Sequence, residues 1–303
     1  MKFATVLLVA AALLASPAGA KIPKPEAPPR TILFIGNSFT QGAHSAVRNW
    51  RASSVTDLNR AGYGGVPALF KAFTEQAGLN YVVSLETQGG KSLGFHYDER
   101  RSLFDKPWDV VVLQEFSTLN REKPGDPATT LKDTRRLSEL LTRRNPRVQI
   151  DLMATWSRAD LTYKPGSRWS GSTIASMAGD LQKASEEVCR DVPQVQQVLP
   201  VGAAWTRAFE SGVADPNPYD GIAFGQLGLW AYDHYHGSVA GYYLEALVVF
   251  GAITGIDPTT LGKDEVAADE LGLSDQQAAA LQKVASEELA SRRGGGRCRA
   301  LAR

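Results

Sequence analysis

The sequence predicts a single α/β domain with three layers, in which helices cover both faces of a mostly parallel, doubly wound sheet. Residues 31–35 and 108–113 are short apolar runs of the kind that form strands buried on both faces of a parallel sheet. Segments with helical spacing alternate with further strand-like segments along the chain. This alternation indicates right-handed crossovers and a sheet between two helical layers.

The expected elements follow one another in the order that this fold requires. The first helix covers residues 67–77, with Pro67 in its first turn and Gly78 just past its end. Residues 239–250 form a strongly apolar helix that Ser238 can cap. The remaining expected strands are residues 80–85, 148–154 and 195–199, and the remaining expected helices are residues 128–143, 172–188, 203–209 and 274–290.

The two ends of the chain differ in composition from the region between them. Residues 1–20 contain an early lysine, an apolar run and closing small residues, as in an export signal with its cleavage site. Residues 21–30 contain four prolines and are expected to form an extended leader. We therefore place the folded domain at residues 31–290 and expect a disordered tail at residues 291–303, which contain three consecutive glycines.

The charge balance excludes partners that are held by charge alone. The sequence has 33 basic and 32 acidic residues and no dense basic run, so we expect no nucleic-acid partner. Beyond residues 1–20, no apolar stretch reaches the roughly 18 residues that a membrane helix needs. These observations predict a periplasmic or secreted protein without stable membrane insertion.

The two cysteines, Cys189 and Cys298, leave two possibilities open. After export they would meet oxidising conditions and could form a disulfide that ties the tail to the domain. Alternatively, Cys189 is a buried thiol and Cys298 is unpaired. Neither cysteine has the spacing of a redox motif or a metal site, so no catalytic role is expected.

A serine follows the first buried strand, in the segment Gly36-Asn37-Ser38. Ligands of open α/β folds bind at the carboxyl ends of the strands, where this serine is expected to lie. Ser38 could offer both its hydroxyl and its backbone N–H to a substrate carbonyl. An ordinary turn with serine as a helix N-cap is the alternative.

A second polar motif, Asp233-His234-Tyr235-His236, lies near the other end of the domain. Asp233 and His236 are three residues apart, so the carboxylate can bind Nδ1 of the imidazole and leave Nε2 as a base. The alternatives are a solvated loop or a metal site built from Asp233, His234 and His236. Because only His44 and His96 remain as further imidazoles, the donors for a metal are few, and we expect neither metal nor cofactor.

Together, these two motifs make the sequence similar to the SGNH or GDSL hydrolase superfamily over most of residues 31–258. The first block of that superfamily, Gly-Asp-Ser, corresponds to Gly36-Asn37-Ser38, and its last block, Asp-x-x-His, corresponds to residues 233–236. The resemblance implies a flavodoxin-like fold. It also implies that Ser38 is the nucleophile, His236 the general base and Asp233 the orienting carboxylate.

The other two superfamily blocks are less well matched. Gly90 corresponds to the superfamily glycine that donates its N–H to the oxyanion. Gly90 also begins the segment Gly-Lys-Ser, but a phosphate loop is excluded there because Leu85 occupies the position of the required earlier glycine. Gln114 follows the middle strand where the superfamily places asparagine. Its amide either points at the oxyanion or binds the neighbouring loop.

Three further residues are candidates for the pocket: Asn37 beside the nucleophile, His234 beside Asp233, and Trp156 at a strand end. The resemblance and the motifs together predict an exported serine esterase or O-deacetylase that acts through an acyl-serine intermediate on a small-molecule or carbohydrate ester. A carbohydrate-binding protein without activity on the same fold, prompted by the missing asparagine, is one alternative, and a metal-dependent hydrolase is the other.

Overall fold

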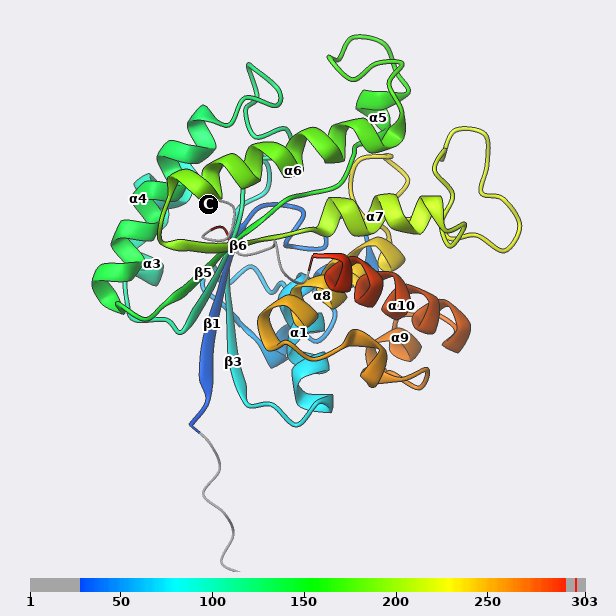
Figure 1. Cartoon of the computed structure of the whole chain (residues 1–303). Helices are drawn as coiled ribbons and strands as arrows, with labels where there is room; N and C mark the ends of the chain where they lie inside the picture. Colours follow the sequence, from blue (N-terminus) through cyan, green and yellow to red (C-terminus); the bar gives the residue numbers. More distant parts are fainter. Residues whose placement is uncertain (1–27, 293–297, 299–303) are drawn as a thin grey trace, which may run out of the picture.

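The computed structural model describes residues 28–292 and Cys298 (Figure 1). The expected export signal at residues 1–20 lies outside the described residues. The same holds for leader residues 21–27 and for tail residues 293–297 and 299–303.

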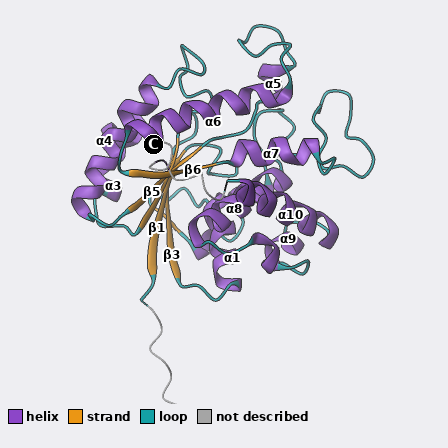
Figure 2. Cartoon of the chain, viewed as in Figure 1, coloured by secondary structure: helices purple, strands orange, loops and turns teal. Residues whose placement is uncertain are grey.

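Six parallel strands form one sheet in the order β2-β3-β1-β4-β5-β6. Figure 2 shows the strands in orange, with helices on both sides of them. The central strand β1 (Arg30–Gly36) lies between β3 (Tyr81–Thr87) and β4 (Val110–Gln114). The remaining strands are β2 (Thr56–Asp57) at one edge and β5 (Gln149–Met153) followed by β6 (Val195–Leu199) at the other. The predicted α/β class with a parallel sheet is therefore confirmed.

The apolar run of β1 is buried on both faces, as its composition predicted. Ile32 and Phe34 belong to the hydrophobic core on one face of the sheet, while Leu33 and Ile35 belong to the core on the other. Side chains alternate along a strand, so a continuous apolar run fills two cores at once. The carboxyl end of β1 is consequently held firmly in place. This also fixes the position of the residues that directly follow the strand.

Helices form a layer on each side of the sheet (Figure 1). The first layer contains α1 (Gly65–Gln76), α7 (Val201–Glu210), α8 (Val239–Thr254) and α10 (Asp275–Ser291). The second contains α3 (Arg101–Phe104), α4 (Ala128–Arg144) and α6 (Ile174–Asp191). The short helix α3 was not predicted, and the other six helices agree with the predicted ones to within a few residues at each end.

The sequence did not predict several short elements. These are the α-helical turns α2 (Leu93–Phe95), α5 (Ala159–Thr162) and α9 (Val266–Glu270), the 3₁₀ turns Ala46–Asn49, Ala52–Ser54 and Pro258–Leu261, and a π turn at His96–Arg100. Strand β2 was also missed. Elements of two to five residues contain too few positions to show a hydrophobic period.

Helix α8 begins in the sequence shortly after the Asp-x-x-His motif. Its N-cap is Ser238, as predicted, and the Ser238 hydroxyl accepts a hydrogen bond from the N–H of Gly241. The helix is buried on nearly all sides, which explains its uniformly apolar sequence. The cap and this burial together fix the chain just after His236.

A disulfide joins Cys189, in α6, to Cys298, with 5.6 Å between their Cα atoms. Both residues are buried in the core on the α4 side of the sheet. The structure therefore corrects the expected disordered tail at one point, because Cys298 packs against the domain. Within the described residues, no helix has the length and apolar character needed to cross a membrane.

Candidate active site

The turn after β1 holds Ser38 at the carboxyl edge of the sheet. Gly36 is required there because a Cβ at this position would collide with Oγ1 of Thr40 and would lie 2.7 Å from Oε1 of Gln114. Ser38 is partly exposed, whereas both of its neighbours, Asn37 and Phe39, are buried. The tight turn thus presents the serine hydroxyl to solvent from a buried frame.

The amide of Gln114 supports this turn, and the structure corrects its predicted role as an oxyanion donor. Its Oε1 accepts hydrogen bonds from the N–H of Asn37 at 2.9 Å and from the hydroxyl of Thr40 at 3.0 Å. Its Nε2 donates to the carbonyl of Glu115. Gln114 is 1% exposed, so both ends of this amide are committed to the protein. The alternative of a buried amide that binds a neighbouring loop is the one observed.

Asn37 is a buried bridge and does not line a pocket. Its Nδ2 donates to the carbonyl of Lys91 at 3.0 Å and to that of Glu115 at 3.3 Å, and its Oδ1 accepts from the N–H of Phe39. The side chain therefore connects the turn that holds Ser38 to the loop that contains Gly90 and to the end of β4. This arrangement replaces our pocket assignment of Asn37.

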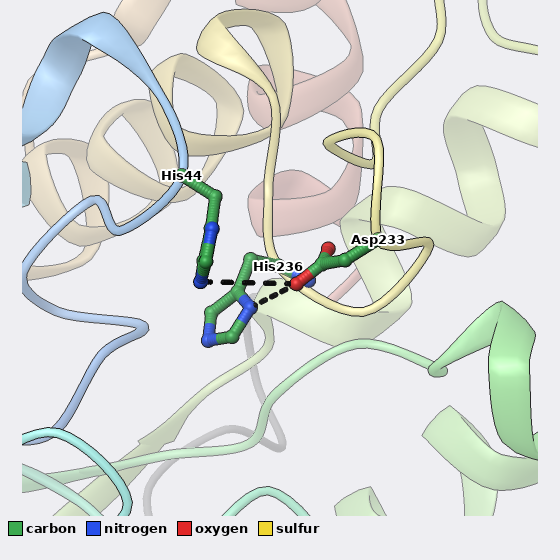
Figure 3. Close-up of side chains that lie close together, drawn as sticks. All are labelled: His44, Asp233 and His236. Carbon is green, nitrogen blue, oxygen red and sulfur yellow. Dashed lines mark hydrogen bonds and ion pairs between the residues drawn. The ribbon is translucent and has the colours of Figure 1, made fainter.

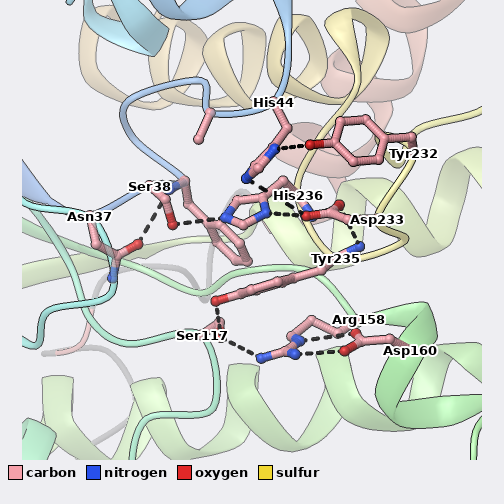
Figure 4. A network of polar contacts seen from close by, with 12 residues as sticks. Asn37, Ser38, His44, Ser117, Arg158, Asp160, Tyr232, Asp233, Tyr235 and His236 are labelled. Atoms are coloured by element: carbon pink, nitrogen blue, oxygen red, sulfur yellow. Dashed lines mark hydrogen bonds and ion pairs between the residues drawn. The ribbon is translucent and has the colours of Figure 1, made fainter.

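Ser38, His236 and Asp233 form a continuous hydrogen-bonded chain (Figure 4). The Oγ of Ser38 lies 2.9 Å from Nε2 of His236, and Nδ1 of His236 lies 2.6 Å from Oδ2 of Asp233. The other oxygen of Asp233 accepts the backbone N–H groups of Tyr235, at 3.1 Å, and of His236, at 3.0 Å. The carboxylate is thus fixed from both sides and fixes the imidazole in turn.

The environment keeps the imidazole neutral and the carboxylate charged at neutral pH. Burial lowers the pKa of His236 and outweighs the hydrogen bond to Asp233, which would raise it; the charges of His44 and Arg158 act in the same direction as burial. Burial alone would raise the pKa of Asp233, but hydrogen bonds from the side chain and N–H of His236 and from the N–H of Tyr235 lower it overall. A neutral imidazole beside a serine hydroxyl can accept its proton.

His44, and not His234, lies beside His236 and Asp233. Its ring centroid lies 4.5 Å from that of His236, its Nε2 is 4.0 Å from Oδ2 of Asp233, and its Nδ1 bonds the hydroxyl of Tyr232 at 2.6 Å. His234 instead has a left-handed backbone (φ 57°), and its ring packs edge-on against Tyr219. The pocket assignment of His234 is therefore corrected.

A possible metal-binding group follows from this arrangement. Ligand atoms of His44, Asp233 and His236 all lie within 4.8 Å of one another (Figure 3). The alternative with Asp233, His234 and His236 is not what the structure brings together. A cation bound here would compete with the proton that Asp233 shares with His236, so it would oppose the role of His236 as a base.

Gly90 lies in the loop that Asn37 contacts, next to the turn that holds Ser38. Its backbone has φ 70°, which favours glycine, and its carbonyl accepts a hydrogen bond from Arg121 at 3.0 Å. Within the described residues, the N–H groups of Gly90 and Ser38 have no protein acceptor. Both groups are free to donate to a ligand.

Trp156 belongs to the core, which corrects its expected place in the pocket. The indole is fully buried, stacks on Phe39 with centroids 4.1 Å apart and on Trp205 at 4.5 Å, and donates from Nε1 to the carbonyl of Tyr235 at 3.1 Å. It supports the Asp-x-x-His turn from behind.

A polar network that the sequence did not predict lies beside Ser38, His236 and Asp233 (Figure 4). It consists of Tyr235, Ser117, Arg158 and Asp160. The ring of Tyr235 packs against that of His236 with centroids 4.1 Å apart. The spacing of these residues in the sequence could not predict the network, because three separate segments contribute to it. His44 had one available signal, its place only six residues after Ser38.

Solved structures of other proteins share the fold of this chain at low sequence identity. One similar structure is a DUF4886 family protein from Bacteroides uniformis, with a TM-score of 0.60 and 17% identity over 87% of this chain and 95% of that one. Another is a protein from Parabacteroides merdae described as a GDSL-like lipase, with a TM-score of 0.51 and 18% identity over 75% of this chain and 95% of that one. At such identities the similarity establishes the fold. No protein-family model and no curated protein matches the sequence.

Proposed function

We propose that the protein is an exported serine ester hydrolase, an esterase or O-deacetylase that acts through an acyl-serine intermediate. The observation that carries this proposal is the continuous chain from Oγ of Ser38 through His236 to Asp233, with a neutral imidazole at its centre. Similarity in fold to a protein described as a GDSL-like lipase supports the same reaction class.

The reaction takes place in two steps. His236 accepts the proton of Ser38 while the serine oxygen attacks the ester carbonyl, and His236 then gives this proton to the departing alcohol. Water attacks the acyl-serine by the same route in reverse, which releases the acid and restores the serine. The N–H groups of Ser38 and Gly90 donate to the negative oxygen in both steps, because neither group has another acceptor among the described residues.

Export rests on residues 1–20, whose composition is that of a signal. The disulfide between Cys189 and Cys298 supports it, because such bonds persist in oxidising compartments. The protein would therefore act in the periplasm or outside the cell. Esters of carbohydrates are the natural class to test first among substrates in that setting.

The test is hydrolysis of p-nitrophenyl acetate by the mature protein, with labelling by a serine-directed phosphonate. We expect turnover and labelling that are both lost in Ser38→Ala. Ser117→Ala is the matched control, because Ser117 is a buried serine that bonds Tyr235 rather than His236. This variant should still be labelled at Ser38. A folded protein that neither turns over nor labels would instead support the binding protein on the same fold.

Treatment with a chelator tests the alternative of a metal-dependent hydrolase. We expect activity to survive treatment with EDTA, whereas a metal-dependent hydrolase would lose activity and regain it when the metal is restored. Zinc added to the treated protein should inhibit it by engaging His44, Asp233 and His236.

A further inference from the structure

A cavity of about 390 Å³ opens beside the proposed catalytic site. Its lining includes Gly90, whose N–H is the proposed oxyanion donor, and Tyr235, whose ring touches that of His236. Phe116 and Leu161 contribute apolar walls, and Arg121 and Arg158 contribute the two charged groups. A ligand in this cavity would therefore adjoin the ester that Ser38 attacks.

The charge of Arg158 is already neutralised. Its guanidinium donates to both oxygens of Asp160, at 3.0 Å from Nε and 2.6 Å from Nη2, and to the hydroxyl of Ser117 at 3.3 Å. It also covers the face of Tyr235, 3.5 Å from the ring centroid (Figure 4). Arg158 thus holds Tyr235 in place as part of the cavity wall and adds little net charge.

Arg121 has the opposite character. It donates from Nη2 to the carbonyl of Gly90 and lies 4.9 Å from the centroid of Phe116, and both partners are neutral. Within the described residues, no carboxylate lies within ion-pair distance of Arg121. The side chain is exposed at the cavity and retains donors that the protein does not use. It is one unpaired positive charge on an otherwise largely apolar and aromatic wall.

We propose that this cavity binds a carboxylate of the substrate, with the Arg121 guanidinium as its partner. This inference rests on the proposed esterase function and narrows the substrate to esters that also carry an acid group. A guanidinium matches a carboxylate through two parallel hydrogen bonds, and one unpaired cation matches one negative charge. The faces of Phe116 and Tyr235 suit the ring or chain that joins the acid to the ester.

Two matched substrate pairs test the proposal. The first pair is the p-nitrophenyl monoester of adipic acid and its methyl ester, which differ in a charge on the acyl side. The second is an O-acetylated methyl glucuronoside and its methyl ester, which differ in a charge on the alcohol side. We expect wild type to prefer the charged member of one pair by about three- to tenfold in kcat/KM.

Variants of Arg121 test whether this residue causes the preference for the charged substrate. Arg121→Gln should remove it and Arg121→Lys should retain part of it, while Lys123→Gln, an equal charge change at an exposed residue outside the cavity lining, should leave it intact. The ratio within each pair is the readout, because Arg121 also holds Gly90 and its loss can slow both members equally. Equal rates in both pairs, or a preference that Arg121→Gln retains, would overturn the proposal.

A binding measurement separates this proposal from the proposed function. Methyl glucuronoside and its methyl ester are titrated into Ser38→Ala and into Ser38→Ala with Arg121→Gln, and binding is followed by NMR. Binding of the acid alone, lost with Arg121, supports the carboxylate site even if p-nitrophenyl acetate is not hydrolysed. Hydrolysis of p-nitrophenyl acetate without any discrimination between acid and methyl ester leaves the esterase and removes the carboxylate site.

Discussion

Nε2 of His236 lies 2.9 Å from Oγ of Ser38, although 198 positions of sequence separate the two residues. One residue follows the central strand β1 and the other precedes helix α8, so the hydrogen bond connects the two ends of the α/β region. Both attachments are buried, which keeps the pair together before any substrate arrives. Preorganisation of this kind lowers the cost of reaching the transition state.

Replacement of Asp233 by asparagine should lower kcat by about 10³–10⁴-fold and leave folding intact. An amide at this position can no longer stabilise the charged imidazole, and it favours the wrong tautomer of His236. Steady-state kinetics with p-nitrophenyl acetate and a thermal melt measure the two effects. Asp160→Asn is a control, since this carboxylate pairs with Arg158 and lies outside the proton path. A kcat of Asp233→Asn close to that of wild type would remove Asp233 from the mechanism.

The pH profile of kcat/KM should rise through a single acid limb whose midpoint lies below 6.5, because burial lowers the pKa of His236 and only the neutral imidazole is a base. Activity is therefore full at neutral pH and is lost as the pH falls through that midpoint. His44→Gln removes a charge that opposes protonation of His236, so its acid limb should move to higher pH. A limb that stays in place would show that the two imidazoles are not coupled.

Gln114→Ala should lower stability by about 1–3 kcal/mol, because the buried N–H of Asn37 loses its acceptor. Activity should fall as well, since the same amide holds the turn that carries Ser38. Urea denaturation and kcat are measured on the same preparation. A loss of about 10²–10³-fold in kcat without any loss of stability would instead restore Gln114 as an oxyanion donor.

Gly36→Ala should impair both folding and turnover, because the added methyl collides with the side chains of Thr40 and Gln114. The backbone of the nucleophile turn must shift to relieve this contact. Gly179→Ala is the matched control: this glycine lies in helix α6 with open space around its Cα, so the same change should be neutral or stabilise by up to about 1 kcal/mol. Thermal melts and kcat of the two variants distinguish the outcomes; equal effects would exclude the close contact as the cause.

Loss of the disulfide should lower the free energy of unfolding by about 2–4 kcal/mol, because Cys189 and Cys298 close a long loop. Cys298→Ser and Cys189→Ser should have similar effects, and the double variant should be no worse than either. Denaturation with and without a reductant measures this. Kinetics at low temperature should barely change, since neither cysteine contacts the Ser38 site; identical melts for wild type and variants would contradict the expectation.

The sequence by itself determined the fold class, the main strands and helices, and three residues of the proposed catalytic chain. It could do so because these features are local. A continuous run of apolar residues indicates that β1 is buried, and Ser38 directly follows this strand. Asp233 and His236 are only three residues apart, so one turn brings them together. The cap of α8 at Ser238 is local in the same sense.

Only the tertiary structure decided how the surrounding residues are used. Gln114 supports the nucleophile turn instead of donating to an oxyanion, because β4 lies beside β1 and its end meets Gly36. Trp156 packs in the core against Phe39. His44, rather than His234, lies beside His236, and the ring of His234 packs against Tyr219. Such roles depend on which atoms of distant segments compete for one space and one set of hydrogen bonds, and no local pattern in the sequence records that competition.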